Sequence, residues 1–375
     1  MRAPTVVVPA RAQCTRPDAT GAFVVAGSLR QEIRFTHVKS GARIAWARSG
    51  RTGAATLLHA AHWMTHVEYD LGSLLWAPWI ERMGRDLQLV RYDERGCGLS
   101  SPDEVPLGLD SLVEELDAVV CAQSAPRVAL LGASGAAATA VAYAALHPER
   151  LSHLVLLGGY QRGLLRRDPS AETLAFFDAQ ERLMALGWGR NDPAVQTFFS
   201  TRFLPDAPRA ALDALNEQQR RSCDGRRAAA VMRARASLDV SALAPQVRVP
   251  TLVLHSEGDL AVPIALGLEL AAAIPGARFE SLHCRNHIPV ATDAAFERLC
   301  LAVHDFVCEP EPGPVLTRRE RELGALVGRG LDNLQIAAQL GLAEKTVRNM
   351  VSALYTKLGV EGRAMAVVRS RDLGL

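Results

Sequence analysis

Short apolar segments alternate with helical patterns along most of the chain. Five of these segments are apolar at consecutive positions, which is typical of strands that are buried on both faces of a sheet. They read TLLHAA, LQLVRYD, RVALLG, HLVLLGG and TLVLHSEGD. Upstream of them, EIRFTHV and RIAWARSG predict two paired strands around a KSGA turn. Because helical patterns separate most of the strands, the sequence predicts an α/β domain with a mainly parallel sheet.

The segment over about 161–246 interrupts this alternation. Its pattern is helical, it is rich in Arg and Ala, and it contains no convincing strand. We therefore expect an all-helical insertion over the sheet, after which VRVPTLVLH resumes the strand pattern.

Two further segments lie outside the expected domains. The first thirty residues lack a sustained period, so we expect a flexible arm over 1–30. Further along, VCEPEPGPV contains three prolines and a glycine, which is typical of a linker. The expected division is thus an α/β domain over 31–307, a linker over 308–315 and a small domain over 316–375.

Four helical patterns fill the small C-terminal domain. Thr317 and Glu320 have the spacing of a capping box at the start of the first helix. A short helix from about Asn333 to Leu340 stops at a glycine, and a longer helix with two distinct faces follows. The apolar face carries Val347, Val351, Leu354 and Leu358, and the polar face carries Lys345, Arg348, Asn349, Ser352 and Thr356. A short helix, a glycine turn and a longer helix are typical of a helix-turn-helix domain.

This domain resembles the LuxR-type DNA-binding domain. The residues that carry the resemblance are Thr317, Arg319, Glu320, Gly330, Asn333, Ile336, Ala337, Leu340, Lys345, Thr346, Val347, Lys357, Leu358, Val360 and Arg363. The resemblance implies that the polar face of the longer helix enters the major groove of double-stranded DNA. It implies base-edge contacts for Arg348, Asn349 and Ser352, and phosphate contacts for Lys345, Thr346 and Lys357.

Two positions of the longer helix depart from the LuxR-type pattern. Ala343 stands where a capping serine is usual, a change that costs a helix about 1 kcal/mol. Met350 replaces a common histidine. Neither departure removes an expected DNA contact.

Composition adds a charge contrast to this division. The 375-residue chain has a net charge of +2, but the part from Val315 to Leu375 has ten Lys and Arg against six Asp and Glu. Hydrophobic residues make up 49% and charged residues 22%, as in ordinary globular proteins. Neither a long uninterrupted apolar stretch nor a signal-peptide pattern occurs, so we expect a cytoplasmic protein without a membrane partner. The seven cysteines form no C-x-x-C pair, and we expect neither a metal nor a cofactor.

The stretch GASGA carries the candidate chemistry of the α/β domain. It follows a predicted strand and precedes the small-residue helix AAATAVAYAALH, which is the setting of a nucleophile elbow. Gly132 and Ala136 are small enough to let the strand and the helix approach each other. Ser134 is the candidate nucleophile, and the backbone N–H of Gly135 is a candidate oxyanion donor. The alternative is a glycine-rich turn with a buried serine.

A serine nucleophile needs a base, and the base needs an acid that orients it. Asp259 ends a predicted strand, where a loop would expose its carboxylate above the sheet. His287 follows the next strand-like run, ARFESL, so that the order is Ser, Asp and His. His283 is a competitor, but it follows that strand more closely, and we favour His287.

Four stretches now resemble the α/β-hydrolase superfamily, in the order of that family: RYDERGCGLS, LLGASGA, PTLVLHSEGDLAVP and NHIP. The resemblance covers about Gln31 to Phe306 and implies an α/β-hydrolase fold whose helical insertion forms a cap. It also implies that the second oxyanion donor is the backbone N–H of Trp63, next to His62 where glycine is common. The polar residues of this loop suggest a metal site as an alternative, but a loop that lines a pocket explains them without a metal.

These observations lead to a DNA-binding transcriptional regulator whose α/β-hydrolase-fold domain senses or hydrolyses a small molecule. The partners expected are double-stranded DNA, a small-molecule ligand or substrate, a second copy of the chain and RNA polymerase. Two alternatives remain at this point. One is an active serine hydrolase that cleaves esters or amides through an acyl-serine, with the DNA-binding domain as an accessory. The other is an inactive scaffold that only dimerises.

Overall fold

The computed structural model describes residues 6–9, 15–17, 23–25, 30–102, 106–188, 192–309 and 316–375. The chain divides into two compact units, Met1–Glu309 and Pro310–Leu375. Most of the expected arm over 1–30 and of the expected linker over 308–315 lies outside the described residues. No helix in the described part of the chain is long and apolar enough to cross a membrane.

A sheet of nine described strands forms the centre of the first unit, in the order β1-β4-β5-β7-β6-β8-β9-β10-β11. The strands are β1 (Val6–Pro9), β4 (Arg30–His37), β5 (Arg43–Gly50), β6 (Thr56–His59), β7 (Gln88–Tyr92), β8 (Val128–Ala133), β9 (Leu151–Leu157), β10 (Thr251–Ser256) and β11 (Arg278–Leu282). β1, β4, β5 and β7 pair antiparallel, and the pairs from β7–β6 to β10–β11 are parallel. A separate antiparallel pair joins β2 (Thr15–Pro17) and β3 (Phe23–Val25). The predictions of a mainly parallel sheet and of a strand pair around the KSGA turn are confirmed.

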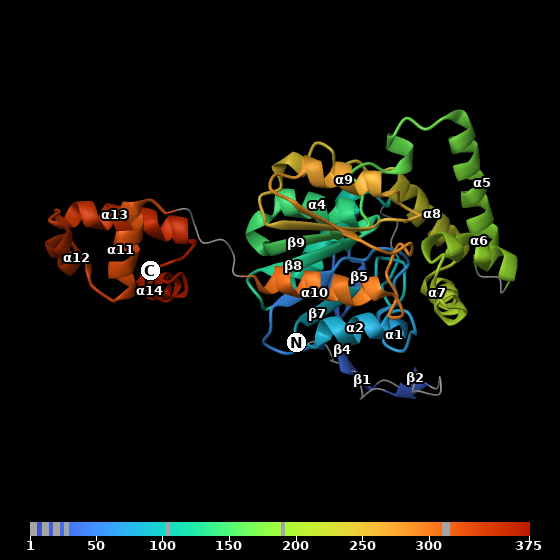
Figure 1. Cartoon of the computed structure of the whole chain (residues 1–375), viewed down its shortest axis with the longest axis horizontal. Coiled ribbons are helices and arrows are strands. Elements are labelled where there is room, and N and C mark those ends of the chain that lie inside the picture. The colour runs from blue at the N-terminus through green and yellow to red at the C-terminus, as the bar shows by residue number, and fades with distance from the viewer. Residues whose placement is uncertain are drawn as a thin grey trace. The chain divides into compact units, whose positions relative to one another are not determined.

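Helices cover both faces of the sheet (Figure 1). One face carries α3 (Leu109–Cys121), α4 (Ala136–Leu146) and α9 (Ile264–Ala273), and the other carries α2 (Ala77–Gly84) and α10 (Ala294–Cys308). Four short helices complete this part: α1 (Val67–Asp70), η1 (Pro148–Arg150), η2 (Leu164–Arg166) and η3 (Ala244–Gln246).

The hydrophobic core has two main layers, one on each face of the sheet. On one face, Leu116 and Tyr143 pack over the sheet and are fully buried. On the other face, Trp79 and Phe296 pack against each other at a ring-centroid distance of 5.9 Å. α4 is buried on all sides over residues 136–144, because its Ala-rich sequence lets it lie directly against β8 and β9. This close packing fixes the turn between β8 and α4.

Four helices between β9 and β10 form a cap at one end of the sheet, seen in green to yellow in Figure 1. They are α5 (Ala171–Gly187), α6 (Pro193–Phe203), α7 (Arg209–Ser222) and α8 (Gly225–Ala236). Ser170, Asp192 and Asp224 cap three of them through side-chain oxygens. The buried residues of the cap include Met184 and Trp188, which share a cluster with Met64 from the loop after β6. The helical insertion is therefore packed onto the loop that precedes α1.

The second unit consists of α11 (Arg318–Gly328), α12 (Asn333–Leu340), α13 (Glu344–Leu358) and α14 (Arg363–Asp372). The predicted capping box is present, because Thr317 Oγ1 accepts from the Glu320 N–H and a Glu320 carboxylate oxygen accepts from the Thr317 N–H. Gly341 ends α12 in the left-handed region, with a φ of 62°. All four apolar residues of the predicted inner face of α13 are buried. The helix-turn-helix prediction is confirmed.

Candidate functional site

The turn between β8 and α4 holds Ser134 in a strained backbone conformation. Its φ is 52°, in the left-handed region that costs an L-residue about 1–2 kcal/mol. The turn is tight, because a Cβ atom at Gly132 would lie 2.7 Å from the Cβ of Ala140 in the following helix. Only glycine at this position lets the strand and the helix approach so closely. Ser134 is half-buried, as a nucleophile elbow requires of a hydroxyl that must meet a ligand.

The structure brings Asp259 and His287 together. Nδ1 of His287 lies 2.6 Å from Oδ2 of Asp259, and both side chains are buried. Oδ1 of Asp259 accepts from the backbone N–H groups of Ala261 and Val262 at 2.8 and 2.9 Å. Burial favours the neutral acid, but the charge and hydrogen bond of His287 and these N–H groups together lower the pKa of Asp259. Asp259 is therefore held as a carboxylate beside the imidazole.

Nε2 of His287 has no hydrogen-bond partner among the described residues, although it is buried. When Nδ1 donates to Asp259, Nε2 is left as a proton acceptor. The competitor His283 lies elsewhere, because its side chain is 99% exposed and pairs with Glu257. Of the two histidines, His287 has the surroundings of a general base.

Both backbone groups that the sequence assigns to the oxyanion hole lie free of internal hydrogen bonds. Gly135 precedes the first residue of α4, and Trp63 lies in the loop after β6. Within the described part of the chain, neither N–H donates to a backbone or side-chain acceptor. The Gly135 N–H directly follows Ser134 in the chain, and an unpaired N–H beside a nucleophile is what stabilisation of an oxyanion needs.

An aromatic cluster lies beside His287. The Phe203 ring is 5.7 Å from the His287 ring and 5.6 Å from the Trp63 ring, and Trp63 in turn lies 6.3 Å from Trp188. The backbone of Phe203 also accepts a 2.8 Å hydrogen bond from the His287 N–H. Since Phe203 ends α6, the cap directly supports the loop that carries the histidine.

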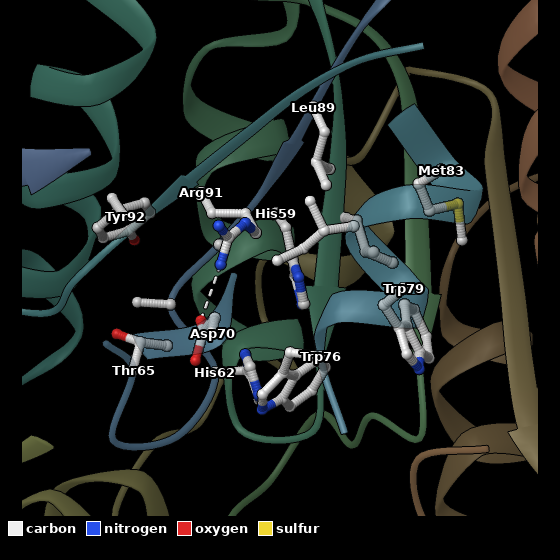
Figure 2. A pocket seen from close by; sticks show the side chains of 14 residues that line it. His59, His62, Thr65, Asp70, Trp76, Trp79, Met83, Leu89, Arg91 and Tyr92 are labelled. Carbon is white, nitrogen blue, oxygen red and sulfur yellow. Dashed lines mark hydrogen bonds and ion pairs between the residues drawn. The ribbon is translucent and has the colours of Figure 1, made fainter. Parts of the chain in front are cut away.

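A small pocket lies against the loop after β6 (Figure 2). Its volume of about 20 Å³ is enough for one water molecule. His59 and His62 stack in its wall with ring centroids 4.8 Å apart and planes 4° apart, and the Trp76 ring meets His62 edge-on. Across the pocket, Asp70 accepts a 2.8 Å hydrogen bond from Arg91 (Figure 2).

Burial strongly shifts the pKa values of ionisable groups in this pocket. Burial and the charge of Arg91 lower the pKa of His59 to about 3. Burial raises the pKa of Asp70 to about 7, although the positive charge of Arg91 opposes the shift. The described residues contain no group of three or more His, Cys, Asp or Glu side chains that could hold a metal ion. Buried polar side chains, among them His59, His62, Asp70 and Arg91, therefore line this pocket against the loop after β6.

The second unit presents the expected DNA-contacting residues on one exposed surface of α13. Lys345, Thr346, Arg348, Asn349, Ser352 and Lys357 are all exposed. Two of them form ion pairs: Arg348 Nη2 lies 2.8 Å from Glu344 Oε1, and Lys357 Nζ lies 2.7 Å from Glu320 Oε1. α13 begins without a side-chain cap, as Ala343 predicts.

Comparison with known proteins gives each unit a family. The family described as "alpha/beta hydrolase fold" matches residues 66–294, which is more than half of the chain. The chain belongs to the α/β-hydrolase fold family. Its C-terminal unit is a LuxR-family domain, because the family described as "Bacterial regulatory proteins, luxR family" matches residues 314–370. The predicted architecture of a hydrolase domain followed by a DNA-binding domain is confirmed.

Individual relatives match one unit or the other. The chain is 53% identical over 57 residues to "Probable transcriptional regulatory protein SgaR" of Hyphomicrobium methylovorum, a match that spans 15% of this chain and 27% of that protein. It is 27% identical over 226 residues to "Putative carbamate hydrolase RutD" of Escherichia coli O157:H7, spanning 58% of this chain and 81% of that protein. A solved enol-lactonase from Burkholderia xenovorans LB400 is 22% identical, with a TM-score of 0.61 over 74% of this chain and all of that one. This last likeness supports the α/β-hydrolase fold alone.

The sequence does not predict a residue that contacts the backbone directly after Ser134. Arg235, on α8 of the cap, is buried and reaches the carbonyls of Ala61 and Gly135. The cap contains many arginines, and nothing in the sequence around Arg235 separates it from its neighbours. Its ion-pair partner Glu94 lies in the RYDERGCGLS stretch. A buried acid needs a cation beside it, and this need is the only indication of such an arginine.

Proposed function

We propose that this protein is a DNA-binding transcriptional regulator whose hydrolase domain cleaves a small acyl compound through Ser134. The observation that carries the proposal is the strained φ of Ser134 at the turn after β8, with the buried Asp259–His287 pair in the same domain. A strained serine in this turn is stabilised only by the packing around it, and such strain is typical of functional sites.

The described residues support an acyl-transfer mechanism. The Oγ of Ser134 attacks the carbonyl carbon of the substrate, and Nε2 of His287 takes the hydroxyl proton. Asp259 stays ionised and stabilises the imidazolium that forms, consistent with its lowered pKa. The backbone N–H groups of Gly135 and Trp63 bind the oxygen that becomes negatively charged.

His287 then acts as an acid, and afterwards as a base once more. The tetrahedral intermediate collapses to an acyl-serine, and the imidazolium of His287 gives its proton to the leaving group. Water then attacks the acyl carbon while His287 takes a proton from it. The second intermediate releases the acid product and returns the proton to Ser134, so that the site is restored.

The aromatic cluster favours a small, partly apolar substrate. Phe203 lies next to His287 and Trp63 lies next to Phe203, so a group bound beside the histidine would meet ring faces and edges. The likeness to a carbamate hydrolase supports an ester, amide or carbamate as the bond that is broken. That relative matches 58% of this chain, so the likeness bears on the reaction class of the hydrolase domain.

The DNA-binding half of the proposal rests on the exposed face of α13. Arg348, Asn349 and Ser352 would read bases, and the flanking cations would contact phosphates. Domains of this type generally work in pairs, so we propose a homodimer that acts with RNA polymerase in the cytoplasm.

The proposal is tested by labelling the full chain with a fluorophosphonate probe. Labelling of the wild type that disappears in Ser134→Ala would support an activated serine. The second measurement is binding of the same preparations to DNA fragments from a random library. Selective enrichment of one sequence by both proteins would show that the two units work as proposed.

One result would favour the alternative of a hydrolase with an accessory DNA-binding domain. In that case the wild type is labelled, yet it enriches no DNA sequence over random fragments. A protein that enriches a DNA sequence but is never labelled would instead be a receptor that retains the hydrolase fold.

A further inference from the structure

Arg235 joins the cap to both sides of the candidate oxyanion hole. Nη2 donates to the Ala61 carbonyl at 2.9 Å, and Nη1 donates to the Gly135 carbonyl at 3.4 Å and to Thr139 Oγ1 at 3.2 Å. Ala61 lies in the loop after β6, whereas Gly135 and Thr139 belong to the turn and helix after β8. One guanidinium therefore connects two segments that are far apart in the sequence.

The two carbonyls are close in the chain to the two candidate oxyanion donors. Gly135 supplies one donor through its own N–H, and its carbonyl is the group that Arg235 contacts. On the other side, the peptide group of Ala61 and His62 directly precedes the peptide group that carries the Trp63 N–H. Only the φ and ψ of one residue, Gly135 on one side and His62 on the other, separate each contacted carbonyl from the donor N–H, so anchoring the carbonyls restrains the chain directly beside both donors.

Burial of the Arg235 guanidinium has an electrostatic cost. Arg235 is only 4% exposed, and its charge is compensated by an ion pair with the buried Glu94. A Cβ atom at Gly135 would lie 2.9 Å from Cδ of Arg235, so the absence of a side chain there leaves room for the arginine. A buried pair of this kind stabilises a fold weakly compared with apolar packing, which suggests a role beyond stability.

We propose that Arg235 is a positioning residue for the oxyanion hole, delivered by the cap. It acts on the geometry of the Gly135 and Trp63 N–H groups. Among the described residues, the Arg235 guanidinium donates to Gly135, Thr139, Ala61 and Glu94, and not to Asp259. This proposal rests on the proposed hydrolase function. It makes the chemistry of Ser134 dependent on the position of α8, so that a movement of the cap would change the geometry around the reacting atoms.

The test is the second-order rate of fluorophosphonate labelling in the full chain. We compare Arg235→Lys, which keeps the charge but cannot bridge both carbonyls, with Arg235→Met, which loses the charge. The matched control is Arg233→Met, two residues away on α8, because Arg233 is exposed and pairs with Glu181 and Asp178. Circular dichroism and thermal melting establish that each variant is folded at the assay temperature.

We expect Arg235→Met to be labelled about 100-fold more slowly, the lower end of the range known for loss of an oxyanion donor, and Arg235→Lys about 10-fold more slowly, because lysine keeps the charge and one hydrogen bond. Arg233→Met should stay near the wild-type rate. The midpoint of the rate against pH should not move in Arg235→Lys, since the Asp259–His287 pair keeps its contacts. A shifted midpoint would show a generally loosened site and would overturn the positioning role.

A second measurement covers the case in which Arg235→Met does not fold. Arg235→Ala is assayed with added guanidinium ion, which should restore part of the labelling rate by refilling the space of the lost group. No restoration in a folded variant would count against the proposal. Wild-type rates in both Arg235→Lys and Arg235→Ala would overturn it while leaving the hydrolase function intact. A wild type that is never labelled would overturn both.

Discussion

Arg348 and Glu344 form an ion pair one helical turn apart on α13, with Nη2 and Oε1 2.8 Å from each other. The arginine side chain is 68% exposed and the glutamate 45% exposed. Exposed pairs of this kind contribute at most about 1 kcal/mol. Arg348 can therefore leave Glu344 at little cost, so the pair does not oppose the base contact that we propose for this arginine.

This relationship predicts the effect of removing the base-reading side chains. Arg348→Ala and Asn349→Ala should each lower the preference for the specific site by about 1–3 kcal/mol, while Ser134 labelling stays unchanged. Binding of specific and random DNA duplexes by fluorescence anisotropy measures the preference. Variants that discriminate as well as the wild type would show that α13 reads bases through other residues.

Lys357 should behave differently, because a phosphate contact carries no sequence information. Lys357→Gln should weaken binding to all duplexes alike and reduce the slope of log affinity against log salt by about 1. Glu320→Gln is the matched variant, since its amide can still complete the capping box with Thr317 while releasing the lysine. It should bind DNA more tightly, and a loss of binding would mean that Glu320 orients Lys357 productively.

The backbone strain at Ser134 predicts a difference between two inactive variants. Ser134→Gly and Ser134→Ala both remove the hydroxyl, but only glycine adopts a φ of 52° without strain. The free energy of unfolding of the hydrolase domain should therefore be about 1 kcal/mol higher in Ser134→Gly. Urea denaturation of the two variants side by side measures this difference. Equal stabilities would indicate that the turn relaxes when the serine is replaced.

The buried His59 predicts a pH dependence of stability. Its folded-state pKa of about 3 lies below the ordinary value of 6.5, so the unfolded chain binds the extra proton as pH falls through that range. Its contribution to stability is present above pH 6.5 and is lost on acidification, at up to about 1.4 kcal/mol per pH unit. Asp70 acts in the opposite direction, because its raised pKa contributes stability that is lost as pH rises towards 7.

The comparison of His59→Gln with the wild type isolates the histidine from these other groups. The free energy of unfolding of the hydrolase domain, measured between pH 4 and 7, should fall less on acidification in the variant than in the wild type. Parallel curves for the two proteins would place the acid sensitivity elsewhere.

The sequence predicts the parts of the structure that depend on local patterns of residues. The bounds expected for the short helix, Asn333 to Leu340, agree with α12, because an Asp cap and a glycine stop mark its ends. Likewise, Ser134 is recognisable because a tight strand-to-helix turn demands small neighbours. Asp259 and His287 follow from their places after strands, and the structure brings these two together. Their roles in a reaction remain predictions.

Other parts depend on contacts that no local pattern records. Arg235 meets Ala61, 174 residues away in the chain, only because α8 packs over the loop after β6. The pairing of β1 with β4 also has no signal in the sequence, since residues 1–30 show no sustained period. Both contacts depend on tertiary packing, so they form only once the cap and the sheet are in place.

The missing cap of α13 has a consequence for how DNA is held. α11 and α12 both begin with capping boxes, whereas Ala343 offers no side-chain oxygen to the first N–H groups of α13. The start of a helix carries a partial positive charge, and a phosphate is an oxygen-rich anion that suits it. If α13 docks as proposed, a backbone phosphate of the operator takes the place of the absent serine. Binding of the operator and capping of the helix that reads it would then be coupled.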